Sequence, residues 1–356
     1  MGKKRVGVLY GGRSVEHDIS LLSAKNIYQN IDRDKFDVTL LGIDKLGRWF
    51  LMDSIDQPIG AGKPLQLVLD AAHPSLSYQN TKVELDIVFP VLHGTDGEDG
   101  SIQGLFQTVS LPYVGSGVLG SAAAMDKLLS KRVMQSAGLP VAQFLDYSIE
   151  EIDEISFKKV SEYLGLPIII KPVNLGSSVG VSKVSNEAEF KAALADAFKY
   201  DNAILIEEFI EAREVECGIL GNINPLASVA GEVILSNKYS FYSFTAKYED
   251  PDSAEITIPA ELPDEVHTNI KKLSLEAYKL LNCKDLSRID LFVRENGEVL
   301  INEINTIPGF TNISMYPSLM RHEGIAYKEL ITRLLEMALA RFQANTRIST
   351  DYESQL

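Results

Sequence analysis

The stretch SRIDLFVRENGEVLINEIN, residues 287–305, restricts the fold more than any other part of the chain, because it places Asn-Gly between two strand-like runs. Asn-Gly flanked by such runs is the strongest short signal for a β-hairpin with a two-residue type I′ turn. A two-residue turn at Asn296 and Gly297 pairs Glu295 with Glu298. The register of the hairpin follows from this pair, since side chains alternate between the two faces of a strand.

This register predicts one polar and one apolar face. Asp290 lies opposite Glu303, and Arg288 lies opposite Asn305. The apolar face carries Ile289, Leu291, Val293, Leu300 and Ile304. Two opposed carboxylates repel each other unless a cation lies between them, and hard oxygen ligands suit Mg²⁺, especially Mg²⁺ that also binds nucleotide phosphates. The hairpin therefore predicts a Mg²⁺ site, with a solvated face of cross-strand ion pairs as the alternative.

The first part of the chain reads as an α/β unit. RVGVLYGG, DVTLLGID and LDIVFPVLHG are short β-rich runs, and residues 14–30 between the first two have helical apolar spacing. This alternation predicts a doubly wound parallel sheet. Residues 47–83 are less regular and read as an insertion or edge, with strands at GRWF and PLQLVLD and a loop at AAHPSLSYQN.

Two further units follow. Ser121 is predicted to cap a single helix that ends at Gly138, before Pro140. The next predicted elements are the strands LPIIIKPV, GVSKV and NAILIEEFI and the helix NEAEFKAALADAF. From about Glu211 we expect the strands REVECGILG and ASVAGEVIL, a long polar-aromatic loop, a helix from DEVHTNIKK onward, the hairpin and the final helix AYKELITRLLEMALARF.

The glycine-rich stretch KPVNLGSSVGVSKV, residues 171–184, has two interpretations. Backbone N–H groups of such a loop can bind phosphate oxygens, and Lys171 could add a positive charge. The stretch nevertheless lacks the residue order of a P-loop, which argues against a P-loop kinase, and GVLYGG near the start fails the dinucleotide-binding pattern. Taken alone, the loop is either a flexible hairpin or a phosphate lid.

Composition excludes several classes of function. The net charge of -15 argues against a nucleic-acid partner. Two cysteines without CxxC spacing give no disulfide framework and only a weak metal case. The sequence shows neither a signal peptide nor a stretch of about 20 apolar residues, so we expect no membrane contact and a cytoplasmic protein.

Ordered motifs along nearly the whole chain make it resemble the D-alanine:D-alanine ligases of the ATP-grasp superfamily. The matching stretches are YGGRSVEHDIS, VLHGTDGEDGSIQG, MDKLLSK, KPVNLGSSVGVSKV, IEEFIEAREVE, FYSFTAKY, SRIDLF and NEINTIPGFTNISMYPSL. The resemblance implies a three-domain ATP-grasp ligase of the α/β class with an N-terminal doubly wound parallel-sheet domain. We expect an N-terminal substrate-binding domain at 1–116, a central ATP-grasp domain at 117–210, a C-terminal ATP-grasp domain at 211–345 and a tail at 346–356.

The resemblance also implies a reaction. The carboxylate of a first D-alanine attacks the γ-phosphate of ATP to give an acyl phosphate and ADP, and the amine of a second D-alanine displaces the phosphate. The resemblance implies ATP and two Mg²⁺ ions, replaceable by Mn²⁺, as the cofactors. A homodimer is the implied assembly.

Site residues carry over by similarity. In the nucleotide site, Lys127, Lys171 and Ser178 would contact phosphates, Glu207 the adenine amino group, Phe209 and Ile210 the adenine through their backbones, and Glu214 the ribose. The metal ligands would be Asp290, Glu303 and Asn305. Arg288 and the Gly309 amide would face the developing oxyanion, where fixed donors lower the barrier.

The remaining implied residues bind D-alanine. Glu16 would receive the first ammonium, His93 would lie near the first carboxylate, and Ser177 would bond Glu16 and Tyr248 to join the loops over the site. Lys247 lies beside Tyr248 in a long polar loop of the kind that closes over a site. Ser314 and Met315 would surround the second D-alanine.

Three alternatives stay open at this point. Ligation to D-serine or D-lactate would keep the mechanism, but Tyr248 and the apolar Met315 favour D-alanine as the acceptor. A nucleotide-binding sensor without turnover is the rival from another class, because a fold alone does not fix function.

Overall fold

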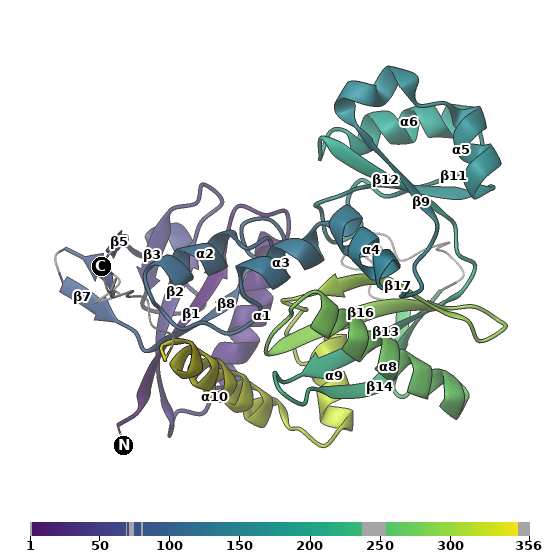
Figure 1. Ribbon diagram of the computed structural model, residues 1–356. Coiled ribbons are helices and arrows are strands. Elements are labelled where there is room, and N and C mark those ends of the chain that lie inside the picture. Colours follow the sequence, from purple (N-terminus) through teal and green to yellow (C-terminus); the bar gives the residue numbers. More distant parts are fainter. Residues whose placement is uncertain (1, 69, 71–74, 80, 237–253, 348–356) are drawn as a thin grey trace, which may run out of the picture.

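The computed structural model describes residues 2–68, 70, 75–79, 81–236 and 254–347. These residues form three sheets of four or five strands and a small sheet of three strands. In Figure 1 the central four-stranded sheet and its helices stand apart from the other two large sheets as a projecting lobe. The predicted mixed α/β architecture is confirmed.

The N-terminal sheet is doubly wound, as predicted. Its strand order is β4-β3-β2-β1-β8. β1 runs parallel to β2 and β8, whereas β3 and β4 add an antiparallel edge. Alternate side chains of β1 pack on opposite faces: Val6 and Val8 contact the α1 side, and Leu9 contacts the α2 side. The bounds are β1 (Lys4–Gly11), α1 (His17–Asn30), β2 (Phe36–Ile43), β3 (Trp49–Met52), β4 (Lys63–Pro64), β8 (Ile87–Val91) and α2 (Ser101–Thr108).

The insertion contains more strand than the sequence predicted. After the short 3-10 helix η1 (Ile59–Ala61), the strands β5 (Gln66–Val68), β6 (Ser75–Tyr78) and β7 (Thr81–Glu84) form a separate antiparallel sheet. The predicted strands in GRWF and PLQLVLD are confirmed as β3 and β5. The predicted loop over residues 71–80 is wrong from Ser75 to Tyr78, because Leu76 is buried between two polar neighbours and gives this short run the alternation of a strand.

The prediction of a single helix beginning after Ser121 is also wrong, because the helix begins earlier and is divided in two. Helix α3 (Val118–Met125) already contains Ser121, which is buried and donates to the Ser116 carbonyl instead of capping. Asp126 then leaves the helical conformation, and its side chain accepts from the Leu129 amide to begin α4 (Lys127–Ser136). Gly138 ends this pair at a positive φ of 79°, as predicted.

The central sheet has its own hydrophobic core. Its order is β11-β10-β12-β9, with every pair antiparallel. The predicted strands and the α6 helix are confirmed, whereas β9, η2 and α5 were not predicted. Ile168, Ile170, Ile204 and Ile206 pack against α5 and α6. The bounds are β9 (Phe144–Ser148), η2 (Ile149–Glu154), α5 (Phe157–Leu164), β10 (Ile168–Pro172), β11 (Ser182–Val184), α6 (Glu187–Ala197) and β12 (Ala203–Glu208).

The C-terminal sheet has the order β15-β14-β13-β16-β17. Helices α3 and α4 share its core rather than that of the central sheet. The final helix α10 returns to pack on α1 and β8 of the N-terminal sheet, visible as the yellow helix in Figure 1. The bounds are β13 (Arg213–Leu220), β14 (Leu226–Leu235), β15 (Ala254–Thr257), α8 (Asp264–Leu280), β16 (Leu286–Val293), β17 (Val299–Asn305), α9 (Met315–His322) and α10 (Tyr327–Asn345). The domain boundaries at 116, 210 and 345 stay a prediction.

The β16–β17 hairpin keeps the predicted register at its polar end but reaches it differently. Arg288 pairs with Asn305 and Asp290 with Glu303, as predicted. Near the turn the register is shifted by one residue, because Arg294 pairs with Glu298 and leaves three residues in the loop instead of two. A β-bulge at Asn302 restores the alignment.

The shifted register changes the apolar face. Ile289, Leu291, Val293 and Ile304 lie in the predicted core. Leu300 does not, because it pairs with Phe292 and packs with it on the opposite face. Val299 and Ile301 take the core positions instead.

Candidate active site

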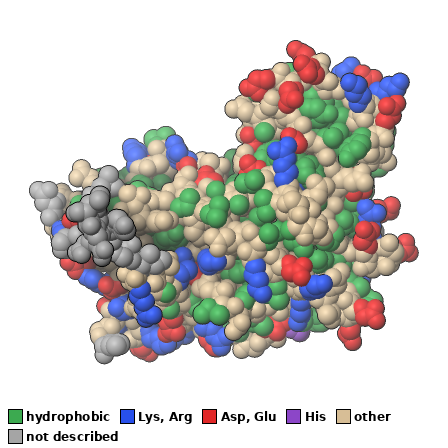
Figure 2. Space-filling model, viewed as in Figure 1, with side chains coloured by type: hydrophobic (Ala, Val, Ile, Leu, Met, Phe, Trp, Pro, Cys, Tyr) green, Lys and Arg blue, Asp and Glu red, His purple; other side chains and the backbone are tan. Residues whose placement is uncertain are grey.

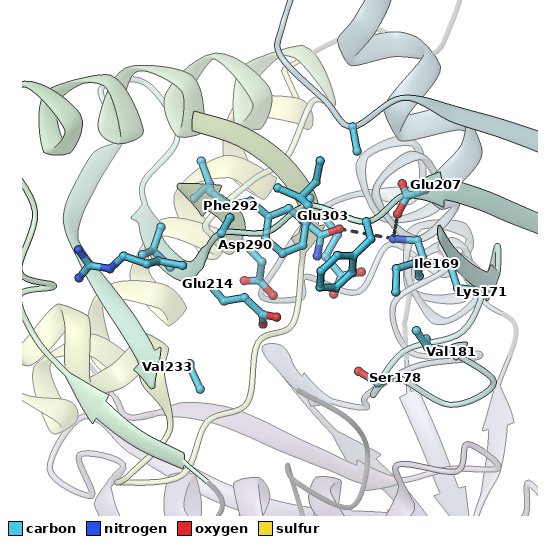
Figure 3. Close-up of a pocket in the computed structure, with 18 of the residues that line it drawn as sticks. Ile169, Lys171, Ser178, Val181, Glu207, Glu214, Val233, Asp290, Phe292 and Glu303 are labelled. Carbon is cyan, nitrogen blue, oxygen red and sulfur yellow. Dashed lines mark hydrogen bonds and ion pairs between the residues drawn. The ribbon is translucent and has the colours of Figure 1, made fainter. Parts of the chain in front are cut away.

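A cleft of about 540 Å³ lies between the central and C-terminal sheets, a size typical of small-molecule sites. Figure 3 shows Lys171 and Glu207 of the central sheet, with Ser178 of the loop between β10 and β11, across the cleft from Asp290, Glu303 and Glu214 of the C-terminal sheet. Predicted nucleotide residues that line the cleft are Lys127, Lys171, Ser178, Glu207, Phe209, Ile210 and Glu214. A smaller cavity adjoins it, and Glu16, Lys127, Ser177, Glu303 and Asn305 line that cavity.

Three buried charges meet at the base of the cleft. One oxygen of Glu207 lies 2.6 Å from the Lys171 ammonium and the other 2.7 Å from that of Lys131. Burial acts to raise the pKa of Glu207, but the two lysines outweigh it and hold this pKa below its usual range. Lys131 is fully buried on α4, one helical turn after Lys127. Sequence reasoning missed it, because nothing in the sequence around Lys131 indicates its pairing with Glu207.

The apolar part of the cleft resembles a slot for a flat ring. Ile169 and Val181 lie on the central side, and Phe292 and Val233 on the other (Figure 3). Phe209 is covered by the Lys183 ammonium, 3.6 Å from the ring centroid. The backbone N–H of Phe209 donates to the Pro167 carbonyl, so this N–H is engaged within the protein.

The glycine-rich loop reaches Glu16, the residue before α1. The Ser177 hydroxyl donates a hydrogen bond to the Glu16 carboxylate. Ser177 and Ser178 both have positive φ, 54° and 58°, a conformation that costs free energy for residues other than glycine. A Cβ at Gly176 would lie 2.9 Å from a Glu16 carboxylate oxygen, so a larger residue there would displace that oxygen. The predicted Ser177–Glu16 contact is confirmed, whereas Lys247 and Tyr248 lie outside the described residues.

The hairpin carboxylates occupy one wall of the cleft. Lys127 lies 3.6 Å from Glu303 and also donates to the Leu175 carbonyl. Arg288 donates to both oxygens of Asp290, each at 2.7 Å, and its Nε lies 2.8 Å from Glu216. Burial acts to lower the pKa of Arg288, but Asp290 and Glu216 raise it well above its usual value, so the guanidinium stays charged.

The donor atoms of this wall are of the kind that Mg²⁺ binds, but they are not arranged around a metal position. Asp290 and Glu303 supply oxygen donors from opposed strand positions, and Asn305 can supply an amide oxygen. At present the Asn305 amide nitrogen donates to Asp290 at 3.0 Å. Among the described residues, no group of three or more His, Cys, Asp and Glu side chains is arranged to hold a metal ion. These side chains would have to turn to bind one.

His93 and Glu98 hold the chain that follows the hairpin. His93 Nδ1 lies 2.9 Å from the Ile307 carbonyl, so this nitrogen carries the proton, and Nε2 lies 3.1 Å from the Ser23 hydroxyl. Burial lowers the pKa of His93. Glu98 accepts from the amides of Gly94 and Ile307, both at 2.9 Å. Burial, reinforced by the charge of Glu16, raises the pKa of Glu98 to about 8.

Five of the predicted residues that the structure describes line neither cavity: His93, Arg288, Gly309, Ser314 and Met315. Gly309 lies in the segment between Ile307, which contacts His93, and Ser314. The Ser314 hydroxyl accepts from the Thr311 amide at 3.0 Å. Met315 is only 5% exposed and packs in the hydrophobic core. Their contacts with a substrate stay predictions.

The arrangement of two sheets closing on a nucleotide-sized cleft, with lysines on one wall and carboxylates on the other, is that of an ATP-grasp enzyme. Family models agree in detail: "D-ala D-ala ligase N-terminus" matches residues 5–116 and "D-ala D-ala ligase C-terminus" matches residues 133–336. The chain belongs to the D-alanine–D-alanine ligase family.

Individual relatives cover almost the whole chain. It is 47% identical to a D-alanine–D-alanine ligase of Shouchella clausii over 98% of both chains. It is 44% identical to D-alanine–D-alanine ligase A of Escherichia coli, over 98% of this chain and 100% of the relative.

Solved structures agree with the fold. The D-alanine-D-alanine ligase of Coxiella burnetii superimposes with a TM-score of 0.87 at 36% identity, covering 98% of this chain and 97% of the other. The VanG D-Ala:D-Ser ligase of Enterococcus faecalis superimposes with a TM-score of 0.86 at 33% identity, covering 95% and 100%. The fold is therefore shared by ligases that are named for different acceptors.

Proposed function

We propose that this ATP-dependent ligase joins two D-alanines to give D-alanyl-D-alanine, ADP and phosphate, the reaction that peptidoglycan precursor synthesis requires. The observation that carries the proposal is the placement of Lys127 and Lys171 in the same cleft as Asp290 and Glu303. Positive charges can offset charge on a transferring phosphoryl group, while carboxylates can bind the metal that accompanies ATP. Bound Mg²⁺ would polarise the phosphate oxygens of ATP.

The smaller cavity suits the first D-alanine. Glu16 lines it and offers a carboxylate to an ammonium group, while Ser177 holds that carboxylate from the glycine-rich loop. Because the cavity adjoins the ATP cleft through Lys127 and Glu303, a carboxylate bound there has a short path to the γ-phosphate. Its attack gives an acyl phosphate, from which the amine of the second D-alanine can displace phosphate. Arg288, which stays charged, is the proposed donor to the oxyanion that then develops.

Assembly, location and metal stoichiometry remain part of the proposal. No helix among the described residues is long and apolar enough to cross a bilayer. On the face in Figure 2, acidic and basic side chains are interspersed, which fits a small-molecule enzyme better than a nucleic-acid binder. A cytoplasmic homodimer that uses two Mg²⁺ ions, or Mn²⁺ in their place, stays a prediction.

ADP formation tests turnover against the sensor alternative. The purified chain is incubated with ATP and Mg²⁺, with and without D-alanine, and ADP is measured. We expect D-alanine to raise the rate of ADP formation at least about tenfold, a change of about 1.4 kcal/mol in the barrier. L-Alanine at the same concentration is the control. Tight ATP binding without D-alanine-dependent ADP formation would support the sensor.

A further inference from the structure

Lys131 has no role in the reaction proposed above. It is fully buried and does not line the cleft, yet its ammonium lies 2.7 Å from a Glu207 oxygen that does. The side chain of Lys131 is 1% exposed and that of Glu207 5%. A buried lysine is costly unless it is paired, so this contact is the reason that a lysine can occupy the position at all.

The contact also crosses between two parts of the molecule. Lys131 belongs to α4, which packs in the core of the C-terminal sheet. Glu207 belongs to β12 of the central sheet, where it pairs with Ile169 of β10. The second Glu207 oxygen is bound by Lys171, which also lies 3.4 Å from the Asn302 side-chain oxygen. Glu207 is therefore held from behind by Lys131 and from the phosphate side by Lys171.

The charges of this triad give Lys131 two effects. Burial lowers the pKa of Lys131, and the neighbouring Glu207 carboxylate opposes this shift. With both lysines protonated, Lys131, Lys171 and Glu207 carry one net positive charge, whereas Lys171 and Glu207 alone would be neutral. With Lys131 present, Glu207 stays ionised, and its negative charge is shared between two lysines instead of neutralising Lys171 alone. An ionised carboxylate only accepts hydrogen bonds, so it favours the 6-amino group of adenine and disfavours the 6-oxo group of hypoxanthine.

We infer that Lys131 is a positioning residue for nucleotide specificity: by binding one Glu207 oxygen from behind, it fixes the carboxylate that selects a 6-amino purine. The inference rests on the proposed nucleotide site but not on the identity of the amino acids joined. Lys131 itself touches no ligand in this assignment and acts only through Glu207.

Equilibrium binding of ADP and IDP tests this inference without relying on turnover. Calorimetry is performed on the wild type, Lys131→Met, Glu207→Gln and the double variant. We expect wild type to prefer ADP, and Lys131→Met to reduce the ADP-over-IDP ratio at least about tenfold. Arg132→Met, at the adjacent exposed residue of α4, is the matched control and should leave the ratio unchanged.

The double variant separates specificity from folding. Removing both charges avoids an unpaired buried carboxylate, and Lys171 keeps its contact with the Asn302 side-chain oxygen, so we expect this variant to fold even if Lys131→Met does not. Once Glu207 is Gln, Lys131→Met should not change the ratio further. A wild-type ratio in Lys131→Met, or an additional change in the double variant, would overturn the inference. If ADP binds selectively but no ligation is detected, the proposed reaction fails while the role of Lys131 stands.

Discussion

The junction between the N- and C-terminal sheets differs in chemistry from the junction between the central sheet and the rest. At the first, strands of the N-terminal sheet share one continuous hydrophobic core with α9 and α10. At the second, the central sheet keeps a separate core, and the contacts across the junction are a small apolar cluster around Ala142, Ile210 and Leu300 together with charged and polar pairs. Apolar burial fixes two surfaces together over a large area, whereas polar contacts hold only the groups that make them.

This difference explains where the site lies. The carboxylates of the hairpin belong to the part that shares the large core, and Lys171 and Ser177 belong to the part with its own core. A ligand between them can supply contacts that the protein alone lacks. We infer that ATP strengthens the second junction and leaves the first unchanged.

The largest expected effect is at the first junction. Arg341 of α10 binds Asp285 at 2.8 Å, and Asp285 is fully buried and also accepts from the Gly115 amide and from Asn222. Arg341→Met leaves this carboxylate without its counter-ion, and we expect a loss of about 3 kcal/mol in the free energy of unfolding. Denaturant titration measures the loss.

An exposed pair at the same junction provides the control. Lys328 binds Asp32 at 2.9 Å, with 58% of the lysine side chain exposed. Lys328→Met should cost less than about 1 kcal/mol. Equal losses in the two variants would show that burial does not distinguish them.

The second effect is on catalysis. Glu303→Gln keeps the shape of the side chain but removes a charge beside Lys127. We expect about a 100-fold loss in kcat, about 2.7 kcal/mol in the barrier, because metal binding weakens. Near-normal rates at saturating Mg²⁺ would contradict a metal-binding role, and thermal melting should show that the variant is folded.

The third prediction concerns pH. Burial raises the pKa of Glu98 from 4.5 to about 8, so at pH 7 the folded chain keeps a proton that the unfolded chain has lost. This proton stabilises the folded state fully below pH 4.5, and the contribution is lost as pH rises toward 8. We expect the free energy of unfolding to fall by about 1 kcal/mol between pH 7 and 8 through this group.

Glu98→Gln isolates that contribution. Its amide nitrogen cannot accept from one of the two backbone amides, so the variant loses the stabilisation from that hydrogen bond. This loss is independent of pH, and only the slope between pH 7 and 8 should flatten. A slope equal to that of the wild type would contradict the raised pKa.

The smallest effect is at the second junction. Ser177→Ala removes the hydrogen bond to Glu16. Because the group is partly exposed, we expect a change of less than about 1 kcal/mol in stability but about a fivefold rise in KM for D-alanine. Ser161→Ala, on the exposed face of α5, is the control. An unchanged KM would show that the contact between the glycine-rich loop and Glu16 does not contribute to D-alanine binding.

The sequence predicted most where signals are local. Strand and helix patterns located most elements, and period-two alternation brought Asp290 opposite Glu303. It failed where packing decides: Asp126 divides a helix whose apolar pattern is continuous, and the Asn302 bulge compensates for a longer turn. Residues that act through distant partners, such as Lys131 with Glu207, carry no local signal of their pairing. Most site roles came from the resemblance rather than from spacing.

The most direct test of the account is the mass spectrum of the products formed from ATP, Mg²⁺ and an equimolar mixture of D-alanine, D-serine and D-lactate. The account predicts D-alanyl-D-alanine as the main product. D-Alanyl-D-serine or D-alanyl-D-lactate as the main product would contradict the assigned acceptor, and the absence of any D-alanyl product would contradict the proposed reaction.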